Sequence, residues 1–416
     1  MSKSKETLVR YDDIEQAHER LDDETVVKRT PVEQSTSLGD LVGGDVYLKM
    51  EHLQWTGSFK TRGAYNKISQ DVADGVDEFV AASAGNHAQG VALAATKCGA
   101  DSTIVMPKTA PQAKVDATRS YGATVELVGQ DFQDAMEYAQ AQAAQNDDAE
   151  FVHAYDDTDI VAGQGTLGIE MHEDCPDVDT VVVPIGGGGL ISGISTAIKH
   201  LSPETRVVGV QAVGAETVHE SLDKGVPVTL DEVDTIADGI ATGGISDLTL
   251  NLIEEHVDEV VTVTDSDISR AILLLLERAK QVVEGAAAAS VAAILNDDLD
   301  VSGETVMPLL CGGNLDMTML QTALIHALTE REQVLQLRVR IEDTSGKMSE
   351  ISGVIASHGA NIRTVRHDRS VEGLAIGEAY LVFEVETSGS EHARSIVESI
   401  ESEGYVVEEI NRQDDA

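Results

Sequence analysis

The chain has 416 residues, long enough for two or three domains with sizeable cores. Its 73 acidic against 29 basic residues give a formal net charge of −44, spread along the whole chain, which excludes nucleic acid and anionic membranes as partners. No apolar run is long enough to span a bilayer, the first residues lack an apolar signal segment, and the three cysteines lack the spacing of a zinc site or disulfide framework. We therefore expect a cytoplasmic protein.

The dispersed acidic charge has two interpretations. An ordinary cytosolic protein can be this acidic without consequence. Alternatively, the protein is halophilic, and concentrated salt screens the repulsion between its carboxylates. The second interpretation predicts that the native fold needs molar salt.

Taken in chain order, the pattern predicts a helix over residues 11–21, a break at Thr30-Pro31 and a strand over 45–50. Beyond residue 60, short apolar runs alternate with longer amphipathic segments. The runs predicted to form buried strands are 79–82, 102–106, 124–128, 180–184 and 206–210. The segments predicted to form helices are 86–97, 111–121, 132–144 and 191–201. This alternation predicts an α/β fold with a largely parallel sheet covered on both faces.

The last part of the chain has a different pattern. Apolar segments at 268–282 and 286–294 precede a strand at 305–310. After them come predicted strands at 334–341, 361–366, 379–385 and 405–410, with helices at 348–358 and 391–401. The order βαββαβ is that of a ferredoxin-like unit. We predict a first domain over 1–328, a charged linker at 329–333 and a second domain over 334–416.

Lys60 is the first candidate for chemistry. It stands at the predicted start of a helix, after the strand at 45–50, with Gly57 and Gly63 on either side. Partial burial lowers the pKa of a lysine in such a place and frees its amine to form a Schiff base. One lysine proves nothing, so this interpretation depends on the rest of the chain.

Two glycine-containing loops follow predicted strands and open predicted helices. Ser83-Ala-Gly-Asn-His-Ala-Gln89 offers backbone N–H groups and two side-chain donors to an anion, although a capped helix start without a ligand explains it as well. Gly186-Gly-Gly-Gly-Leu190 lets the backbone approach a ligand as closely as a phosphate requires. Ile191 and Ser192 stand where a dinucleotide-binding fingerprint needs its last glycine, so a phosphate fits better than a dinucleotide.

Cys311 follows the strand at 305–310, at the end of a strand where open α/β sheets bind ligands. A small buried core residue is the alternative for any lone cysteine. We favour that alternative for Cys98 and Cys175.

Six motifs stand in the order and at about the spacing of one known family. They are Gly57-Ser-Phe-Lys-Thr-Arg-Gly63, Ser83–Gln89, Gly163-Gln-Gly-Thr166, Gly186–Leu190, Glu284-Gly285 and Cys311-Gly-Gly-Asn314. On these motifs, residues 5–325 resemble the threonine dehydratase (threonine ammonia-lyase) and serine racemase branch of fold type II pyridoxal-phosphate enzymes. The resemblance implies a two-lobed catalytic domain with its smaller lobe at roughly 50–150, pyridoxal 5'-phosphate as cofactor, and assembly into a dimer or tetramer.

The resemblance also implies roles for the matched residues. The cofactor would be bound by Lys60, which joins its aldehyde, and by Phe59, Asn86, Gly186, Gly187, Gly188, Gly189, Leu190 and Cys311. The substrate would be bound by Ser83, Gly85, His87, Gly239 and Glu284. Asn86 would hydrogen-bond the ring hydroxyl and Cys311 would face the ring nitrogen. Lys60 would also be the catalytic base that removes the Cα proton.

The implied reaction eliminates water from L-threonine to give 2-oxobutanoate and ammonia, with L-serine to pyruvate as a second activity. Ala84 stands where serine racemases carry serine, and alanine cannot transfer a proton to the opposite face of the substrate, so elimination is favoured over racemisation. A neutral thiol at Cys311 would also favour elimination, because it does not stabilise a long-lived carbanion. The rival hypotheses are a serine dehydratase or racemase of the same fold, and a non-catalytic amino-acid sensor. The presence of Lys60 counts against the sensor.

Residues 334–412 resemble an ACT domain, a small module that binds amino acids and regulates enzymes. Asp343 and Gly346 keep two positions of its effector loop, and Asn361 with Ile362 matches the turn into its second strand. The resemblance implies feedback control by isoleucine or valine through these residues.

The divalent-metal site of the racemase branch is not expected here. Gln211 and Thr217 stand where that branch places carboxylates, and only the adjacent Glu216 supplies one. A hard divalent cation needs several oxygen ligands. We therefore predict no dedicated metal site.

Overall fold

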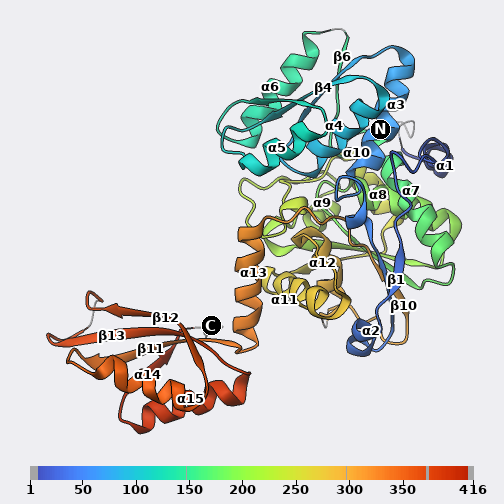
Figure 1. Cartoon of the computed structure of the whole chain (residues 1–416). Helices are drawn as coiled ribbons and strands as arrows, with labels where there is room; N and C mark the ends of the chain where they lie inside the picture. Colours follow the sequence, from blue (N-terminus) through green and yellow to red (C-terminus); the bar gives the residue numbers. More distant parts are fainter. Residues whose placement is uncertain (1–7, 147, 297, 372–373, 411–416) are drawn as a thin grey trace. The chain divides into compact units, whose positions relative to one another are not determined.

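The computed structural model describes residues 8–146, 148–296, 298–371 and 374–410, and the chain divides into two compact units, residues 1–319 and 320–416 (Figure 1). Residues 1–7, which are expected to lack a signal segment, lie outside the described residues. So do residues 411–416, the end of the predicted second domain. Helix α13 (Met317–Glu330) runs across the boundary between the units, and residues 331–333 connect its end to the next strand.

The larger sheet of the first unit has six strands in the order β1-β2-β10-β7-β8-β9. The strands are β1 (Val32–Gln34), β2 (Asp45–Lys49), β7 (Thr180–Pro184), β8 (Arg206–Ala212), β9 (Glu259–Val263) and β10 (Thr305–Pro308). All neighbours pair in parallel except β1 and β2. Every residue of β7 is buried, as expected for a central strand with helices on both faces.

Helices cover this sheet. They are α1 (Tyr11–Arg20), α2 (Thr36–Val42), α7 (Thr158–Asp174), α8 (Gly189–Leu201), α9 (Val218–Lys224), α10 (Asp247–His256), α11 (Asp265–Leu274) and α12 (Gly285–Ile294). Shorter turns of helix are η1 (Glu51–Leu53), η2 (Val213–Ala215), η3 (Asp238–Ile240) and the π-helix η4 (Leu275–Ala279). The apolar segment noted at 268–282 is therefore helical only as far as Ala279.

The smaller sheet of the first unit is parallel throughout, in the order β5-β4-β3-β6. Its strands are β3 (Glu78–Ala82), β4 (Asp101–Met106), β5 (Thr124–Leu127) and β6 (Ala149–Phe151), and the helices around it are α3 (Lys60–Asp74), α4 (Asn86–Cys98), α5 (Gln112–Ser120) and α6 (Phe132–Ala144). Successive side chains of β3 point to opposite faces: Phe79 packs in the core with Ile68 of α3, and Val80 packs with Ala135 of α6. The two-lobed parallel-sheet core is thus confirmed.

The sequence did not predict several elements, among them α7, which lies between the two lobes in chain order. Residues Ile160–Met171 of α7 are buried on all sides, so the helix lacks the apolar and polar faces that give a helical period. Three glycines, Gly163, Gly165 and Gly168, also weaken the helical pattern.

The second unit contains an antiparallel sheet in the order β12-β13-β11-β14. Its elements are β11 (Val334–Glu342), α14 (Lys347–Ser357), β12 (Asn361–Asp368), β13 (Glu378–Glu386), α15 (Ser390–Ser402) and β14 (Val406–Glu409). Alternate residues of β11 and β13, such as Leu337 and Phe383, form one core with Ile351 and Ile396 of the two helices. The predicted βαββαβ order is confirmed.

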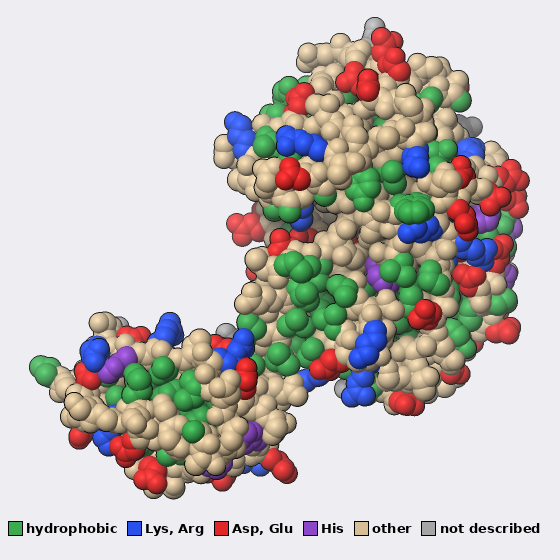
Figure 2. All heavy atoms as spheres, viewed as in Figure 1, with side chains coloured by type: hydrophobic (Ala, Val, Ile, Leu, Met, Phe, Trp, Pro, Cys, Tyr) green, Lys and Arg blue, Asp and Glu red, His purple; other side chains and the backbone are tan. Residues whose placement is uncertain are grey.

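Two features concern the surface. Within the described ranges, no helix is long and apolar enough to cross a membrane. Figure 2 shows that Asp and Glu side chains are scattered over the visible face instead of gathering in one patch.

Candidate active site

The carboxyl ends of β3 and β7, one strand from each parallel sheet, open onto one cavity of ≈ 500 Å³. Open α/β sheets bind ligands at this end of their strands. The predicted cofactor and substrate residues all line the cavity: Phe59, Lys60, Ser83, Gly85, Asn86, His87, Gly186, Gly187, Gly188, Gly189, Leu190, Gly239, Glu284 and Cys311. The fold thus brings together residues from six separate stretches of the chain.

Lys60 is the first residue of α3, and its amine lies inside this cavity. Nζ donates a hydrogen bond to the backbone oxygen of Ala154 at 3.1 Å and lies 5.0 Å from the ring centre of Phe59. Burial lowers the pKa of the Lys60 amine to about 8, although Cys311 and Glu284 oppose the shift. About a tenth of the amine is therefore unprotonated at pH 7, far more than for an ordinary lysine, and this form can act as nucleophile and base.

Glycine packing places the start of α3. A Cβ at Gly90 of α4 would lie 2.9 Å from the backbone carbon of Lys60, so α4 can approach Lys60 only with glycine there. Gly57, before the helix, has a φ of +74°, and a Cβ there would meet Asn314 Oδ1 at 2.5 Å. The glycines around Lys60 therefore serve close backbone approach as well as turn geometry.

The loop Ser83–His87 joins β3 to α4. Ser83 Oγ accepts a hydrogen bond from the Gly85 N–H at 3.1 Å, and His87 Nε2 donates to the Val152 oxygen at 2.9 Å. Burial, followed by the Lys60 charge, lowers the pKa of His87 to about 3, so the ring is neutral. Its remaining nitrogen can only accept, so an anion at this loop would be bound by the backbone N–H groups that begin α4.

The four glycines Gly186–Gly189 lead from β7 into the start of α8 and form a cradle without side chains. Gly188 has a φ of +88°. A Cβ at Gly187 would lie 2.2 Å from the Tyr155 ring, and one at Gly189 would lie 2.9 Å from Tyr155 Cβ. Thr249 Oγ1 donates to the Gly187 oxygen at 2.9 Å and fixes that peptide. The cradle leaves backbone N–H groups at the start of α8 for a phosphate.

Glu284 also lines the cavity, and its carboxyl is enclosed by two glycines. A Cβ at Gly312 would lie 2.2 Å from Glu284 Oε1, and one at Gly239 would lie 2.9 Å from the same atom. Asn86 Nδ2 donates to Glu284 Oε1 at 2.8 Å, and Asn314 Nδ2 donates to Asn86 Oδ1 at 2.8 Å, which fixes the orientation of the Asn86 amide. Burial raises the pKa of Glu284 to about 7, against the opposing hydrogen bond from Asn86.

Cys311 follows β10 and is 2% exposed. Burial, and then the Glu284 charge, raises the pKa of its thiol well above the usual value, so the group is neutral. The resemblance would place this neutral thiol at the ring nitrogen of the cofactor.

The cofactor implied by the resemblance fits these residues. The glycine cradle would accept its phosphate, because any larger residue at Gly187 or Gly189 would collide with Tyr155. The Lys60 amine would hold its aldehyde carbon, and Cys311 would meet its ring nitrogen. The structure therefore supplies a phosphate cradle, an amine of lowered pKa and a neutral thiol in a single cavity.

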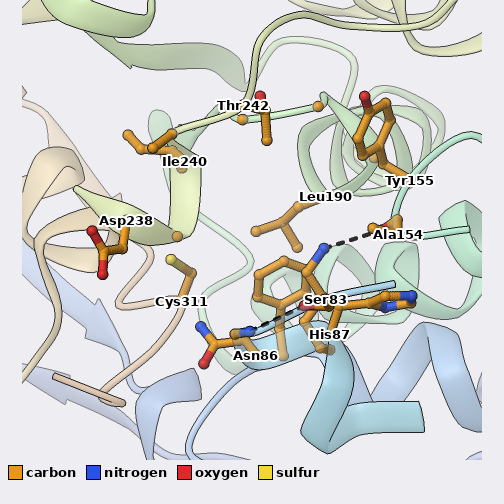
Figure 3. A pocket seen from close by; sticks show the side chains of 18 of the residues that line it. Ser83, Asn86, His87, Ala154, Tyr155, Leu190, Asp238, Ile240, Thr242 and Cys311 are labelled. Atoms are coloured by element: carbon orange, nitrogen blue, oxygen red, sulfur yellow. Dashed lines mark hydrogen bonds between the residues drawn. The ribbon is translucent and has the colours of Figure 1, made fainter. Parts of the chain in front are cut away.

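Several lining residues were not identified from the sequence. They are Lys114, Phe132, Met136, His153, Ala154, Tyr155, Gln164, Asp238 and Ile240–Gly243. Figure 3 labels Ala154, Tyr155, Asp238, Ile240 and Thr242 among them. Three of them, His153 to Tyr155, directly follow the short strand β6, and the carboxyl end of a strand is the signal that would have indicated them. Lys114 Nζ and Asp238 Oδ2 form an ion pair at 3.2 Å, which joins α5 to η3 across the cavity wall.

The predicted effector residues lie in the second unit and are not brought together within one chain. Asp343 pairs with Arg369 at 2.7 Å and with His367, near the end of β12. Asn361, at the start of β12, donates to Glu386 at 3.2 Å. A strand of eight residues is roughly 25 Å long, so these two positions are well separated. Gly346, with a φ of +100°, precedes α14, and Ile362 packs on the core of the unit.

The loop where the racemase branch would bind a cation is held by an amide. Gln211 Oε1 accepts the backbone N–H groups of Thr217 and Val218 at 3.1 and 2.9 Å, and Gln211 Nε2 donates to the Ala215 oxygen. In the described part of the chain, no group of three or more His, Cys, Asp or Glu side chains is arranged to hold a metal ion.

Comparison with known proteins shows which family has this sequence and fold. Residues 24–312 match the family described as pyridoxal-phosphate dependent enzyme. A protein named L-threonine ammonia-lyase from Thermotoga maritima is 44% identical over 404 residues, which cover 96% of this chain and 99% of that protein.

Two solved structures extend the comparison. Processed threonine deaminase isoform 2 from Solanum lycopersicum superposes with a TM-score of 0.72 at 34% identity, covering 77% of this chain and 90% of that one. Maize serine racemase superposes with a TM-score of 0.72 at 33% identity, covering 78% of this chain and 100% of that one. Both similarities extend over about three quarters of this chain.

Proposed function

This chain belongs to the family of pyridoxal-phosphate dependent enzymes, and from that premise we propose that it eliminates water from L-threonine to give 2-oxobutanoate and ammonia. A single observation carries the proposal: the Lys60 amine, with a pKa lowered to about 8, faces a glycine phosphate cradle in the same cavity. The full-length similarity to an L-threonine ammonia-lyase selects this substrate among those of the family.

The cofactor and the protein divide the chemistry. Bound pyridoxal phosphate supplies an electron-withdrawing ring that acidifies the Cα–H bond of an amino acid joined to it. Lys60 Nζ takes that proton, because its pKa, lowered to about 8, gives the free amine a share of the population near neutral pH that an ordinary lysine lacks. The backbone N–H groups of Ser83–His87 bind the substrate carboxylate and set the Cα–H bond toward Lys60.

Two other groups direct the outcome to elimination. Cys311 stays neutral and therefore does not hold a proton on the ring nitrogen as a carboxylate would. Ala84 lines the cavity without a functional group, so this position offers no acid on the face opposite Lys60. Although the fold resembles maize serine racemase, we propose elimination from L-threonine and L-serine without appreciable D-amino acid.

The first test is Lys60→Ala, assayed for keto acid with L-threonine in high salt. We expect loss of turnover by several orders of magnitude, together with loss of the absorption band of the covalently held cofactor. Lys97→Ala, an exposed lysine at the end of α4, is the matched control and should retain both. Turnover of threonine by the Lys60→Ala protein would refute the proposal.

The second unit would regulate the first. We propose that it is an ACT domain through which isoleucine or valine lowers activity, in an enzyme that assembles as a dimer or tetramer in the cytoplasm. The support is the βαββαβ order and the 96% coverage by the full-length relative.

Regulation is tested in the whole chain with Asp343→Asn, which weakens the contacts to Arg369 and His367. We expect basal turnover to be unchanged and the inhibitor concentration for half effect to rise. Light scattering of the same samples gives the assembly state. Undiminished inhibition in Asp343→Asn would remove this residue from the effector site.

A further inference from the structure

His153 occupies the loop after β6 and lines the active-site cavity, yet neither the sequence motifs nor the proposed mechanism uses it. Its Nδ1 accepts two backbone N–H groups, from Asp156 at 2.8 Å and from Tyr155 at 3.3 Å. A nitrogen that accepts two fixed N–H groups cannot carry a proton itself. The single proton of the neutral ring therefore resides on Nε2.

The ring is also held neutral and in place. Burial lowers the pKa of His153, and the Lys60 charge acts in the same direction, while Asp156 and Asp157 oppose it. The ring packs edge-on against Tyr155, with centres 4.7 Å apart and planes at 80°, and against Phe151 at 6.3 Å. The hydrogen bonds that His153 makes with described residues both involve Nδ1, which leaves Nε2 available to a ligand. His153 is thus a rigid, uncharged hydrogen-bond donor in the cavity wall.

His153 and Lys60 line the same cavity, and the Lys60 charge acts on the His153 ring. Ala154, the next residue, accepts the hydrogen bond from Lys60 Nζ at 3.1 Å. Lys60 must reach the Cα proton directly, so the substrate Cα has to lie next to the amine and therefore near the 153–155 loop. The β-hydroxyl oxygen is only two bonds from Cα, so it also lies close to this loop. Figure 3 shows the Tyr155 hydroxyl directed away from Ala154, so Tyr155 is not the donor of this loop toward the amine.

The other polar groups of an amino-acid substrate and its cofactor have donors elsewhere. The start of α4 serves a carboxylate and the start of α8 serves a phosphate. His87, the second imidazole of the cavity, offers only an acceptor, because its Nε2 donates to Val152. The substrate hydroxyl oxygen is the acceptor left for His153.

Building on the proposed function, we propose that His153 Nε2–H donates to the β-hydroxyl oxygen of the bound amino acid and so selects hydroxylated substrates. The donor also stabilises that oxygen as negative charge grows on it during cleavage of the C–O bond. No proton leaves His153: the C–O bonding pair moves to the oxygen, and the proton that completes water comes from the protonated Lys60 amine. A site built to hydrogen-bond a hydroxyl discriminates against the analogue that lacks it.

The test compares L-threonine with L-2-aminobutanoate, which has the same carbon skeleton without the hydroxyl. His153→Phe keeps a ring for packing but has no donor. We expect kcat/KM for threonine to fall about 10- to 100-fold, and threonine binding, followed by the change in cofactor absorption, to weaken. Binding of L-2-aminobutanoate and affinity for the cofactor should stay at wild-type values.

Two further variants separate donation to substrate from support of the loop. His153→Gln places an amide N–H near the position of Nε2, whereas His153→Asn keeps an acceptor for the Tyr155 and Asp156 N–H groups but cannot reach as far. We expect the Gln variant to recover part of the threonine preference and the Asn variant to resemble the Phe variant. The half-buried His256 of α10, outside the cavity, gives His256→Phe as the matched control.

Each other pattern overturns the proposal. Equal loss of threonine and L-2-aminobutanoate binding would assign His153 to the carboxylate, and weaker cofactor binding would assign it to the phosphate. Recovery by Asn but not by Gln would show that the residue only supports the loop. The binding comparison needs no turnover, so an inactive wild-type enzyme would refute the proposed function and still leave the His153 result decisive.

Discussion

Glu284 directly precedes α12, where an acidic side chain could cap the helix, yet it makes no capping hydrogen bond. Its carboxyl instead turns into the cavity, where Asn86 donates to both of its oxygens at 2.8 and 3.1 Å. Enclosure by Gly239 and Gly312 removes water from the group. Burial therefore raises the pKa of Glu284 to about 7.

This shift predicts a pH dependence of stability. Between pH 4.5 and about 7 the folded chain binds a proton at Glu284 that the unfolded chain has lost. The free energy of unfolding should therefore fall as pH rises through that window, by about 3 kcal/mol from this residue, because one pKa unit corresponds to about 1.4 kcal/mol. Glu284→Gln, which keeps the amide contact and cannot ionise, should lack this slope when cofactor-free protein is unfolded with urea at several pH values.

Glu254→Gln, an exposed acid on α10, provides the comparison for that experiment. Its unfolding curves should follow the wild-type pH dependence. A Glu284→Gln protein that loses stability from pH 5 to 8 as steeply as wild type would show that Glu284 ionises in the fold as readily as in water.

The residues of the site differ in how far they could be predicted from the sequence. Lys60, Asn86 and the glycine cradle could be predicted because each stands in a contiguous motif after a predicted strand. His153 and Lys114 could not, because His153 follows a strand of three residues that was not itself predicted, and Lys114 stands in no motif. The role of His153 depends on the two backbone N–H groups that its Nδ1 accepts. Lys114 is held by an ion pair with Asp238, which lies 124 residues away in sequence.

At the scale of elements, α7 and α8 cross at glycines. A Cβ at Gly193 of α8 would lie 2.4 Å from the Val161 oxygen and 2.6 Å from the Gly165 nitrogen, both backbone atoms of α7. A Cβ at Gly165 would lie 2.9 Å from the Gly193 oxygen. The crossing matters for function because α8 begins with the phosphate cradle and α7 packs against Gly63 of the Lys60 helix.

Gly193→Ala should therefore destabilise the first unit. The added methyl group meets backbone atoms of α7, so no rotamer change can accommodate it. We expect the free energy of unfolding to fall by roughly 1–3 kcal/mol through overpacking, which outweighs the gain of about 1 kcal/mol in helix propensity. Thermal unfolding followed by circular dichroism measures it, and cofactor affinity should fall with it.

Gly353→Ala in α14 gives the opposite expectation, because a Cβ there meets nothing within 4 Å. We expect that variant to be equally or slightly more stable in the second unit. A Gly193→Ala protein that melts at or above the wild-type temperature would mean that the two helices can separate at no cost.

The same crossing shows where prediction of elements from sequence ends. Strands β3, β4, β7 and β8 and helices α4 and α6 could be predicted because their apolar patterns are those of half-covered or fully covered elements. Helix α7 could not, because its buried face extends all round, and β6 has only three residues and pairs with a strand far along the chain. Strand order within each sheet depends on such long-range pairing.

At the scale of the whole molecule, charge is the dominant feature. The chain of 416 residues carries a net charge of −44, and its basic residues neutralise acidic ones only at individual ion pairs. Lys49 and Arg62 pair with Glu51 and Glu170 in the core, where salt has little access. The remaining carboxylates on the visible surface are dispersed and repel one another (Figure 2).

We therefore predict that the fold weakens as salt is removed. The Debye length rises from about 3 Å at 1 M to about 10 Å at 0.1 M, so at low salt each surface carboxylate repels several neighbours that unfolding would separate. The melting temperature should fall steeply between about 2 M and 0.1 M KCl. Sucrose, which favours compact states without screening charge, should not replace the salt. A melting temperature that is independent of KCl, or that sucrose restores in full, would identify an ordinary acidic protein whose surface repulsion does not limit its stability.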